Sequence, residues 1–126
     1  MTAEELLFFG THPGLIPLYE TLREKILTDW PDTEIRTAKT QISFYAGHMF
    51  AMVSLPLRRK ADWPKEFLLV SFGLPAPAES PRVGAKTEAA PGRWTHHVPV
   101  TAPEEIDAEL LGWIAAARDF SKRKRR

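Results

Sequence analysis

The sequence contains no cysteine among its 126 residues. That absence excludes disulfide bonds, thiolate metal sites and cysteine nucleophiles, and it is typical of proteins in a reducing compartment. No apolar run approaches the length of a membrane span, and residues 1–5 carry acidic side chains where a secretory signal needs basic ones. From these absences we expect a soluble, cytoplasmic protein that contacts no membrane.

Several catalytic patterns are also missing. The chain has neither a Gly-x-Ser-x-Gly elbow for a nucleophilic serine nor a glycine-rich phosphate loop. His96 and His97 are neighbours, and neighbours in a strand point to opposite faces, so they cannot bind one metal ion together. The four acidic residues between positions 104 and 109 suit the start of a helix, where carboxylates complement the helix dipole. We therefore expect no metal, no cofactor and no catalytic residue.

The charges are nearly balanced over the whole chain but not along it. The formal net charge is +1, and the last five residues, 122–126, are all basic. Without these five, 12 of the 17 basic residues remain against 16 acidic ones, so the body is acidic. We predict a single domain over residues 1–121 and a basic tail over residues 122–126. Contact with nucleic acid is expected only through that tail.

Helical patterns frame the sequence at its N-terminal side. Thr2 and Glu5 have the spacing of a capping box, which predicts a short helix that ends at a left-handed Gly10. A long helix is predicted to begin between Pro13 and Pro17. Its apolar residues recur every three or four positions, and residue 31, a proline, ends it.

A second long amphipathic helix is predicted near the C-terminus. Thr101 and Glu104 form another capping-box pair, and an apolar stripe runs from Ile106 to Phe120. Five segments between the long helices have strand character: residues 34–38, 40–46, 49–55, 67–74 and 94–100. Because the strands follow one another and the helices lie at the ends, we predict an α+β fold, an antiparallel sheet of about five strands flanked by an N-terminal and a C-terminal amphipathic helix. Residues 75–93 hold four prolines and two glycines without periodicity, which predicts a long loop.

One strand offers a face with useful chemistry. Residues 39–45 alternate polar and apolar side chains, so if Ile42 and Phe44 face the core, the polar residues share the opposite face. Matching the apolar set of residues 94–100 then places His97 on the same face as Ser43. We expect two arginines at the rim of this face. The predicted ligand-binding residues are Lys39, Gln41, Ser43, Tyr45, Arg58, Arg93 and His97.

Several of these segments together resemble a known family. They are residues 39–44, Phe50 with Ala51, residues 97–100, and a helical pattern of Asp107, Glu109, Leu110, Trp113, Ile114 and Ala117. The pattern is similar to that of the uncharacterised bacterial family catalogued as domain of unknown function 5655. Family members often carry a basic pair before the Phe-Ala dipeptide, where this chain has Gly47, His48 and Met49. Some relatives are labelled predicted transport proteins and others form the C-terminal part of longer chains, so the resemblance implies an accessory or binding module without an established activity.

Three functions remain open from the sequence. The first is a non-enzymatic module that binds a polar or anionic ligand on the face around Lys39, Ser43 and His97. The second is a small hydrolase or transferase that uses His97 as a general base. The third is a protein-interaction or dimerisation domain that acts through the 75–93 loop.

Overall fold

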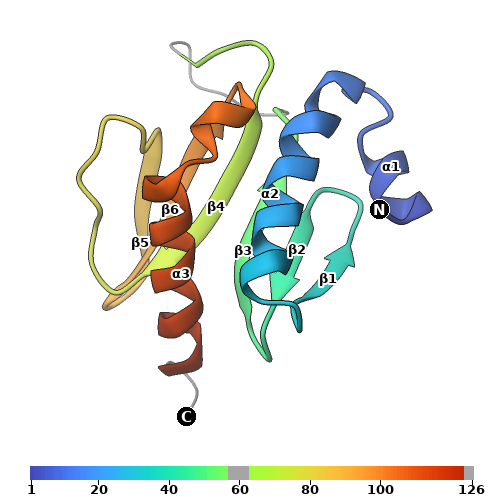
Figure 1. Cartoon of the computed structure of the whole chain (residues 1–126). Helices are drawn as coiled ribbons and strands as arrows, with labels where there is room; N and C mark the ends of the chain where they lie inside the picture. The colour runs from blue at the N-terminus through green and yellow to red at the C-terminus, as the bar shows by residue number, and fades with distance from the viewer. Residues whose placement is uncertain (57–62, 124–126) are drawn as a thin grey trace.

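The computed structural model describes residues 1–56 and 63–123. In these ranges, six antiparallel strands form one sheet, accompanied by three α-helices (Figure 1). The helices are α1 (Ala3–Phe8), α2 (Ile16–Asp29) and α3 (Ala108–Arg123), with short 3₁₀ turns η1 (Pro13–Leu15) and η2 (Pro103–Glu105). The strands are β1 (Glu34–Thr37), β2 (Ile42–Tyr45), β3 (Met49–Ser54), β4 (Leu68–Leu74), β5 (Ala85–Ala90) and β6 (Arg93–Val100). The antiparallel α+β fold predicted from the sequence is confirmed, with six strands where about five were expected.

The N-terminal helix begins as predicted but ends differently. The Thr2 hydroxyl accepts a hydrogen bond from the Glu5 N–H at 3.1 Å, and the Glu5 carboxylate accepts one from the Thr2 N–H at 2.7 Å, which completes the capping box. The prediction of a left-handed Gly10 is wrong, because Gly10 is not among the residues with positive φ. Phe9 caps the helix instead, with its N–H bonded to the carbonyl of Leu6.

The C-terminal helix also differs from the prediction at its start. The Thr101 N–H and hydroxyl donate hydrogen bonds to the carboxylate of Glu105, not of Glu104, at 2.8 and 3.2 Å. The turn η2 follows, and α3 begins only at Ala108. Asp107 accepts a hydrogen bond from the N–H of Leu110 at 3.1 Å, which is the bond that an N-terminal cap makes. The capping residue is therefore Asp107, six positions beyond the predicted threonine.

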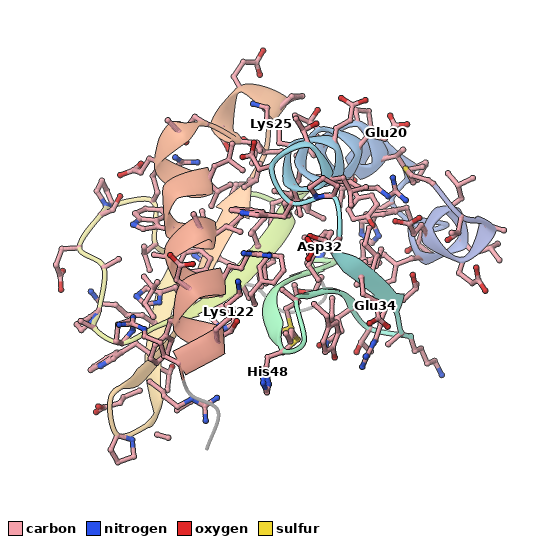
Figure 2. All side chains as sticks on the ribbon, turned by 60° about the horizontal axis from the view of Figure 1, so that its bottom comes forward. Glu20, Lys25, Asp32, Glu34, His48 and Lys122 are labelled. Atoms are coloured by element: carbon pink, nitrogen blue, oxygen red, sulfur yellow. The ribbon has the colours of Figure 1, made fainter. Side chains whose placement is uncertain are left out.

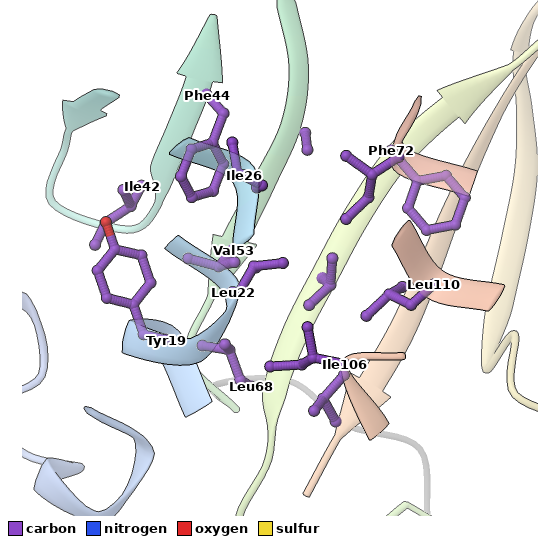
Figure 3. Packing of buried hydrophobic residues seen from close by; sticks show 14 of the residues in the cluster. Tyr19, Leu22, Ile26, Ile42, Phe44, Val53, Leu68, Phe72, Ile106 and Leu110 are labelled. Atoms are coloured by element: carbon purple, nitrogen blue, oxygen red, sulfur yellow. The ribbon is translucent and has the colours of Figure 1, made fainter. Parts of the chain in front are cut away.

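Both long helices pack on the same face of the sheet. The strand register aligns Phe44, Ala51, Phe72 and His96 in one row, one residue from each of β2, β3, β4 and β6. Tyr19 of α2 stacks on Phe44 with 6.3 Å between ring centroids, and Trp113 of α3 stacks on Phe72 at 5.8 Å. The close view shows the apolar side chains of α2 over β2 and β3, and those of α3 beside β4 (Figure 3). The opposite face of the sheet has neither long helix above it.

The segment predicted as one long loop, residues 75–93, contains the edge strand β5. This strand pairs with β6 through a tight hairpin whose turn includes Gly92 with a φ of +73°. The prediction failed because residues 85–90 show neither apolar alternation nor β-branched residues, apart from Thr87. Hydrogen bonds to β6 therefore stabilise this strand, although its own sequence does not favour strand conformation.

The rest of that segment is fastened to the helix side of the molecule. The Arg82 guanidinium donates hydrogen bonds to the carboxylates of Asp107 and Glu109, at 2.8 and 3.1 Å, and another to the backbone carbonyl of Glu105. The pKa of Asp107 lies below its ordinary value because the Arg82 guanidinium and the Leu110 N–H bond to its ionised form. The arginine thereby joins the connection between β4 and β5 to the first turn of α3.

The sheet is continuous at one end and divided at the other. Strands β3 and β4 pair through four residues each, from Ala51 opposite Phe72 to Ser54 opposite Leu69. Beyond that point Met49 pairs with β2 alone, and Gly73 pairs with β6 alone. The two strands run apart toward the bottom of Figure 1, and α3 packs against both of them. This division creates the opening in which the candidate site lies.

Candidate functional site

The face of the sheet opposite the long helices carries a mixed row of side chains. The register brings the following residues into one line across the six strands: Arg36, Ser43, Met52, Ser71, His97 and Ala85. Ser43 and Ser71 are nevertheless almost fully covered, with 3% and 2% of their surface exposed. Their small side chains lie between larger neighbours, so the outer surface of the row consists mainly of arginine, methionine and histidine.

Ser71 and His97 form a close pair within this row. The Ser71 Oγ lies 2.7 Å from the His97 Nδ1, which is hydrogen-bonding distance. Burial lowers the pKa of His97, and the neighbouring His96 lowers it further. A neutral ring is therefore the favoured form of His97 near neutral pH, and its second nitrogen can donate or accept a hydrogen bond.

The residues predicted on β2 lie on the same face as His97 but not beside it. The Gln41 amide donates a hydrogen bond to the Ser43 Oγ at 2.9 Å, and the guanidinium of Arg36 lies over the Tyr45 ring, 3.9 Å from its centroid. Strands β3 and β4 separate Ser43 from His97, so three strand spacings of about 4.8 Å give a separation of about 14 Å. The shared face follows the predicted register, yet one small ligand cannot bridge these residues.

Two predicted cations lie elsewhere. Lys39 occupies the exposed turn between β1 and β2 and is not part of either strand, because the strand β2 begins only at Ile42. That turn is at the opposite end of β2 from the division of the sheet (Figure 1). Arg58 lies outside the described residues.

A cleft of about 140 Å³ lies where β3 and β4 separate. Its apolar lining comes from both sides of the division and includes Met49, Phe50, Met52, Phe72, Trp94 and Phe120. Ser71 and Thr95 contribute hydroxyl groups. Because Ser71 also bonds His97, the cleft begins next to the Ser71–His97 pair.

Arg93 is the one charged residue among the described residues that line this cleft. It is exposed at the first position of β6, directly after the turn at Gly92. Within the described ranges its side chain makes neither a hydrogen bond nor an ion pair, while its backbone pairs with Ala90 of β5. Of the predicted ligand-binding residues that the structure describes, Arg93 is therefore the one that lines the cleft, with its positive charge available to a ligand.

Further basic groups gather at this end of the molecule. Figure 2 shows Lys122, on the last turn of α3, and His48, in the turn between β2 and β3, at the same end. Arg123 lies over the ring of Phe120, 5.8 Å from its centroid, and Phe120 lines the cleft.

The two adjacent histidines of β6 lie on opposite faces of the sheet. His96 faces the helices and His97 the opposite face, as expected for neighbours in a strand. In the part of the chain that the structure describes, histidine, aspartate and glutamate form no group of three or more that could hold a metal ion. No helix there combines the length and apolarity that crossing a membrane requires.

Sequence reasoning finds part of the cleft lining. The alternation of the strands places Thr95 on the face of His97 and adds Ser71 and Gly73 to it, whereas Met52 carries no such signal and Phe120 falls in the apolar stripe of the last helix. The sequence feature that indicates the cleft is the pair of small residues in β4, Ser71 and Gly73, because small side chains leave space between larger neighbours on the sheet. The separation of β3 and β4 depends on hydrogen bonds between strands. The local sequence of either strand does not predict those bonds.

Comparison with known proteins identifies a family. Neither a curated protein nor a solved structure matches the chain. A family does match, over residues 5–121, and this range includes every described strand and helix residue that lines the cleft. Because the match covers most of the 126 residues, the chain belongs to the family described as Domain of unknown function (DUF5655).

Proposed function

We propose that the domain is a non-enzymatic binding module for a small polar or anionic ligand, which occupies the cleft between β3 and β4. The observation that carries the proposal is the position of Arg93, an unpaired cation on the lining of an otherwise largely apolar cleft. A cation beside an apolar surface attracts an anion, and the apolar part of the same ligand can cover that surface.

We also propose a cytoplasmic location, on the lack of cysteine alone.

The proposal shifts the ligand toward one end of the predicted face. Arg93 and His97 remain in the neighbourhood of the ligand, His97 through its bond to Ser71. Gln41, Ser43 and Tyr45 are not among the residues that line the cleft, and Lys39 is too far along the hairpin to take part. The ligand-binding roles of these residues stay predictions.

A thermal-shift screen of small anions and their neutral analogues tests the proposal. Compounds that raise the melting temperature are then mapped by chemical-shift changes of backbone amides in labelled protein. We expect the shifts to concentrate at Met49, Gly73 and Thr95. If no compound binds, or if the shifts lie away from β3, β4 and β6, the proposed function is wrong.

A matched pair of glycine variants connects binding to the cleft. Gly73 lines the cleft, and a Cβ atom there would lie 3.9 Å from the Trp94 carbonyl oxygen, an ordinary contact. Gly73→Leu should therefore fold and fill part of the cleft. Gly112→Ala, on α3 where an added Cβ meets nothing within 4 Å, is the control. Ligand binding should disappear in the first variant and persist in the second.

A second candidate function is hydrolysis or group transfer with His97 as general base. The distance of 2.7 Å between the Ser71 Oγ and the His97 Nδ1 favours it, because a nucleophile and its base require such contact. Against it, Ser71 is 2% exposed and lies in a strand paired on both sides, where backbone N–H groups are not free to stabilise an oxyanion. Labelling of Ser71 by a fluorophosphonate, lost in His97→Ala, would support catalysis and displace the binding proposal.

A third candidate is pairing with another chain through β5. The strand is at the edge of the sheet, and most of its residues are exposed or partly exposed, so its outer edge can accept a further strand. Light scattering over a range of protein concentrations measures this directly. A constant monomer mass would exclude self-association through the 75–93 segment.

A further inference from the structure

We infer that the ligand of the cleft is a carboxylate attached to a single aromatic ring. The inference rests on the proposed function, because it names the chemical class of the ligand for that same site. The size of the cleft, the nature of its lining and the number of its charges restrict the ligand independently.

The volume limits the ligand to about one ring. The cleft measures about 140 Å³. An apolar protein cavity of about 150 Å³ holds one benzene molecule, so the two spaces are comparable. A nucleotide or a fused ring system would extend well beyond the cleft, whereas a phenyl group fits inside it.

The lining favours an aromatic body over a sugar or polyol. Four of its residues, Phe50, Phe72, Trp94 and Phe120, are aromatic, and aromatic rings stabilise one another at their edges and faces. Met49 and Met52 add thioether groups, which adapt to a ring and make favourable sulfur–aromatic contacts. A polyol needs many hydrogen-bonding partners, and the lining residues offer the two hydroxyls of Ser71 and Thr95. An apolar ring therefore loses less on transfer from water than a polyol does.

The charge restricts the anionic group. Arg93 is the single charged residue among the described residues of the lining, and the planar guanidinium matches a carboxylate through two parallel hydrogen bonds. A phosphate monoester carries nearly two negative charges at neutral pH and would leave part of that charge uncompensated. The position of Arg93 directly after the Gly92 turn holds its backbone at the edge of the cleft. A carboxylate at this edge would allow its ring to enter the apolar space.

Calorimetric titration with four probes tests this assignment. Phenylacetate carries both the ring and the carboxylate, phenylacetamide keeps the shape without the charge, acetate lacks the ring, and phenyl phosphate carries a different anion. We expect phenylacetate to bind at least about tenfold more tightly than each of the other three. A tenfold difference corresponds to about 1.4 kcal/mol, which is just below the usual contribution of one hydrogen bond to a charged group.

Two arginine variants separate specific recognition from general attraction. Arg93→Gln should reduce the affinity for phenylacetate to that of phenylacetamide and leave phenylacetamide binding unchanged. Arg36→Gln removes a cation from β1, where it pairs with Glu34, and should leave both affinities unchanged. Both arginines are exposed, so neither substitution should prevent folding.

The outcomes distinguish this inference from the proposed function. Equal binding of phenylacetate and phenylacetamide, or tighter binding of phenyl phosphate, overturns the carboxylate assignment while a ligand in the cleft remains supported. Binding of acetate as tight as that of phenylacetate overturns the requirement for a ring. If no probe binds and the broader anion screen also fails, the inference and the proposed function are both wrong.

Discussion

The Nε2 atom of His96 accepts a hydrogen bond from the backbone N–H of Ala78 at a distance of 2.9 Å. The Nδ1 atom of the same ring lies 3.1 Å from the carbonyl oxygen of Trp94, so it carries the proton and the ring is neutral. His96 is fully buried and stacks on Phe72. A neutral imidazole therefore fastens the segment between β4 and β5 to the core.

We predict that the free energy of unfolding decreases as the pH falls from 7.5 to 5.5. Burial lowers the pKa of His96 below 6.5, the charge of Lys86 lowers it further, and the carbonyls of Trp94 and Phe72 oppose the shift only in part. The unfolded chain then binds the proton more readily than the folded one. The contribution of His96 is complete above the unfolded pKa and is lost as the pH falls toward the folded pKa. Urea denaturation at the two pH values measures the change.

His96→Gln provides the control for this pH dependence. Glutamine can accept the Ala78 N–H bond but does not titrate, so the variant should show a smaller change between the two pH values. Burial also lowers the pKa of His97, which should add to the parent's response in the same direction. If His96→Gln and His97→Gln both retain the full response, other groups are responsible.

We predict that Tyr19→Phe costs about 1–3 kcal/mol of stability, because it removes a buried hydrogen bond to a charged group. The Tyr19 hydroxyl donates to the Glu5 carboxylate, which also accepts from Arg23 at 2.8 Å. Burial alone would raise the pKa of Glu5, but these bonds and that from Thr2 lower it overall, so the carboxylate stays ionised. Tyr45→Phe, on the partly exposed face of β2, should change stability by less than about 0.5 kcal/mol. Equal losses in urea denaturation would contradict the prediction.

Two glycines should respond to alanine in opposite directions. Gly92 has a φ of +73°, which costs an L-residue about 1–2 kcal/mol, so Gly92→Ala should destabilise the hairpin of β5 and β6. Gly112 lies within α3, where an added Cβ meets nothing within 4 Å, and Gly112→Ala should stabilise by about 0.5–1 kcal/mol. Thermal unfolding of the two variants beside the parent checks both signs, and a shared sign would contradict the assigned backbone conformations.

The sequence predicts which face of the sheet a side chain occupies better than it predicts which residues lie beside that side chain. The period of two in residues 39–45 indicates that Ser43 faces away from Phe44, and the same reasoning assigns the face of His97. It gives no distance across the sheet, since that distance depends on the strand order. The order β1-β2-β3-β4-β6-β5 separates Ser43 from His97 by two strands and brings Ser71 to His97 instead, 26 positions apart in the chain.

Features without a local pattern could not be predicted. The strand β5 has the composition of a loop and exists because β6 offers it a paired edge. The cleft results from hydrogen bonds that β3 and β4 do not make beyond Ala51 and Phe72. By contrast, the capping box of Thr2 and Glu5 depends only on residues three positions apart, and it was predicted correctly.

Removal of residues 122–126 tests the predicted role of the basic tail. The structure includes Lys122 and Arg123 in the last turn of α3, whereas residues 124–126 lie outside the described residues. Both described residues are exposed, so their loss should cost at most the roughly 0.3–1 kcal/mol that a cation contributes near a helix C-terminus.

The truncated chain keeps 12 basic and 16 acidic residues, and its net negative charge should repel phosphate groups. Fluorescence anisotropy with a labelled single-stranded oligonucleotide, at low and physiological salt, should therefore show any binding by the parent to be absent from the truncated protein. A variant with serine at the same five positions should behave like the truncated one. Salt-sensitive binding that survives in both would assign the nucleic-acid contact to other basic residues, such as Lys65.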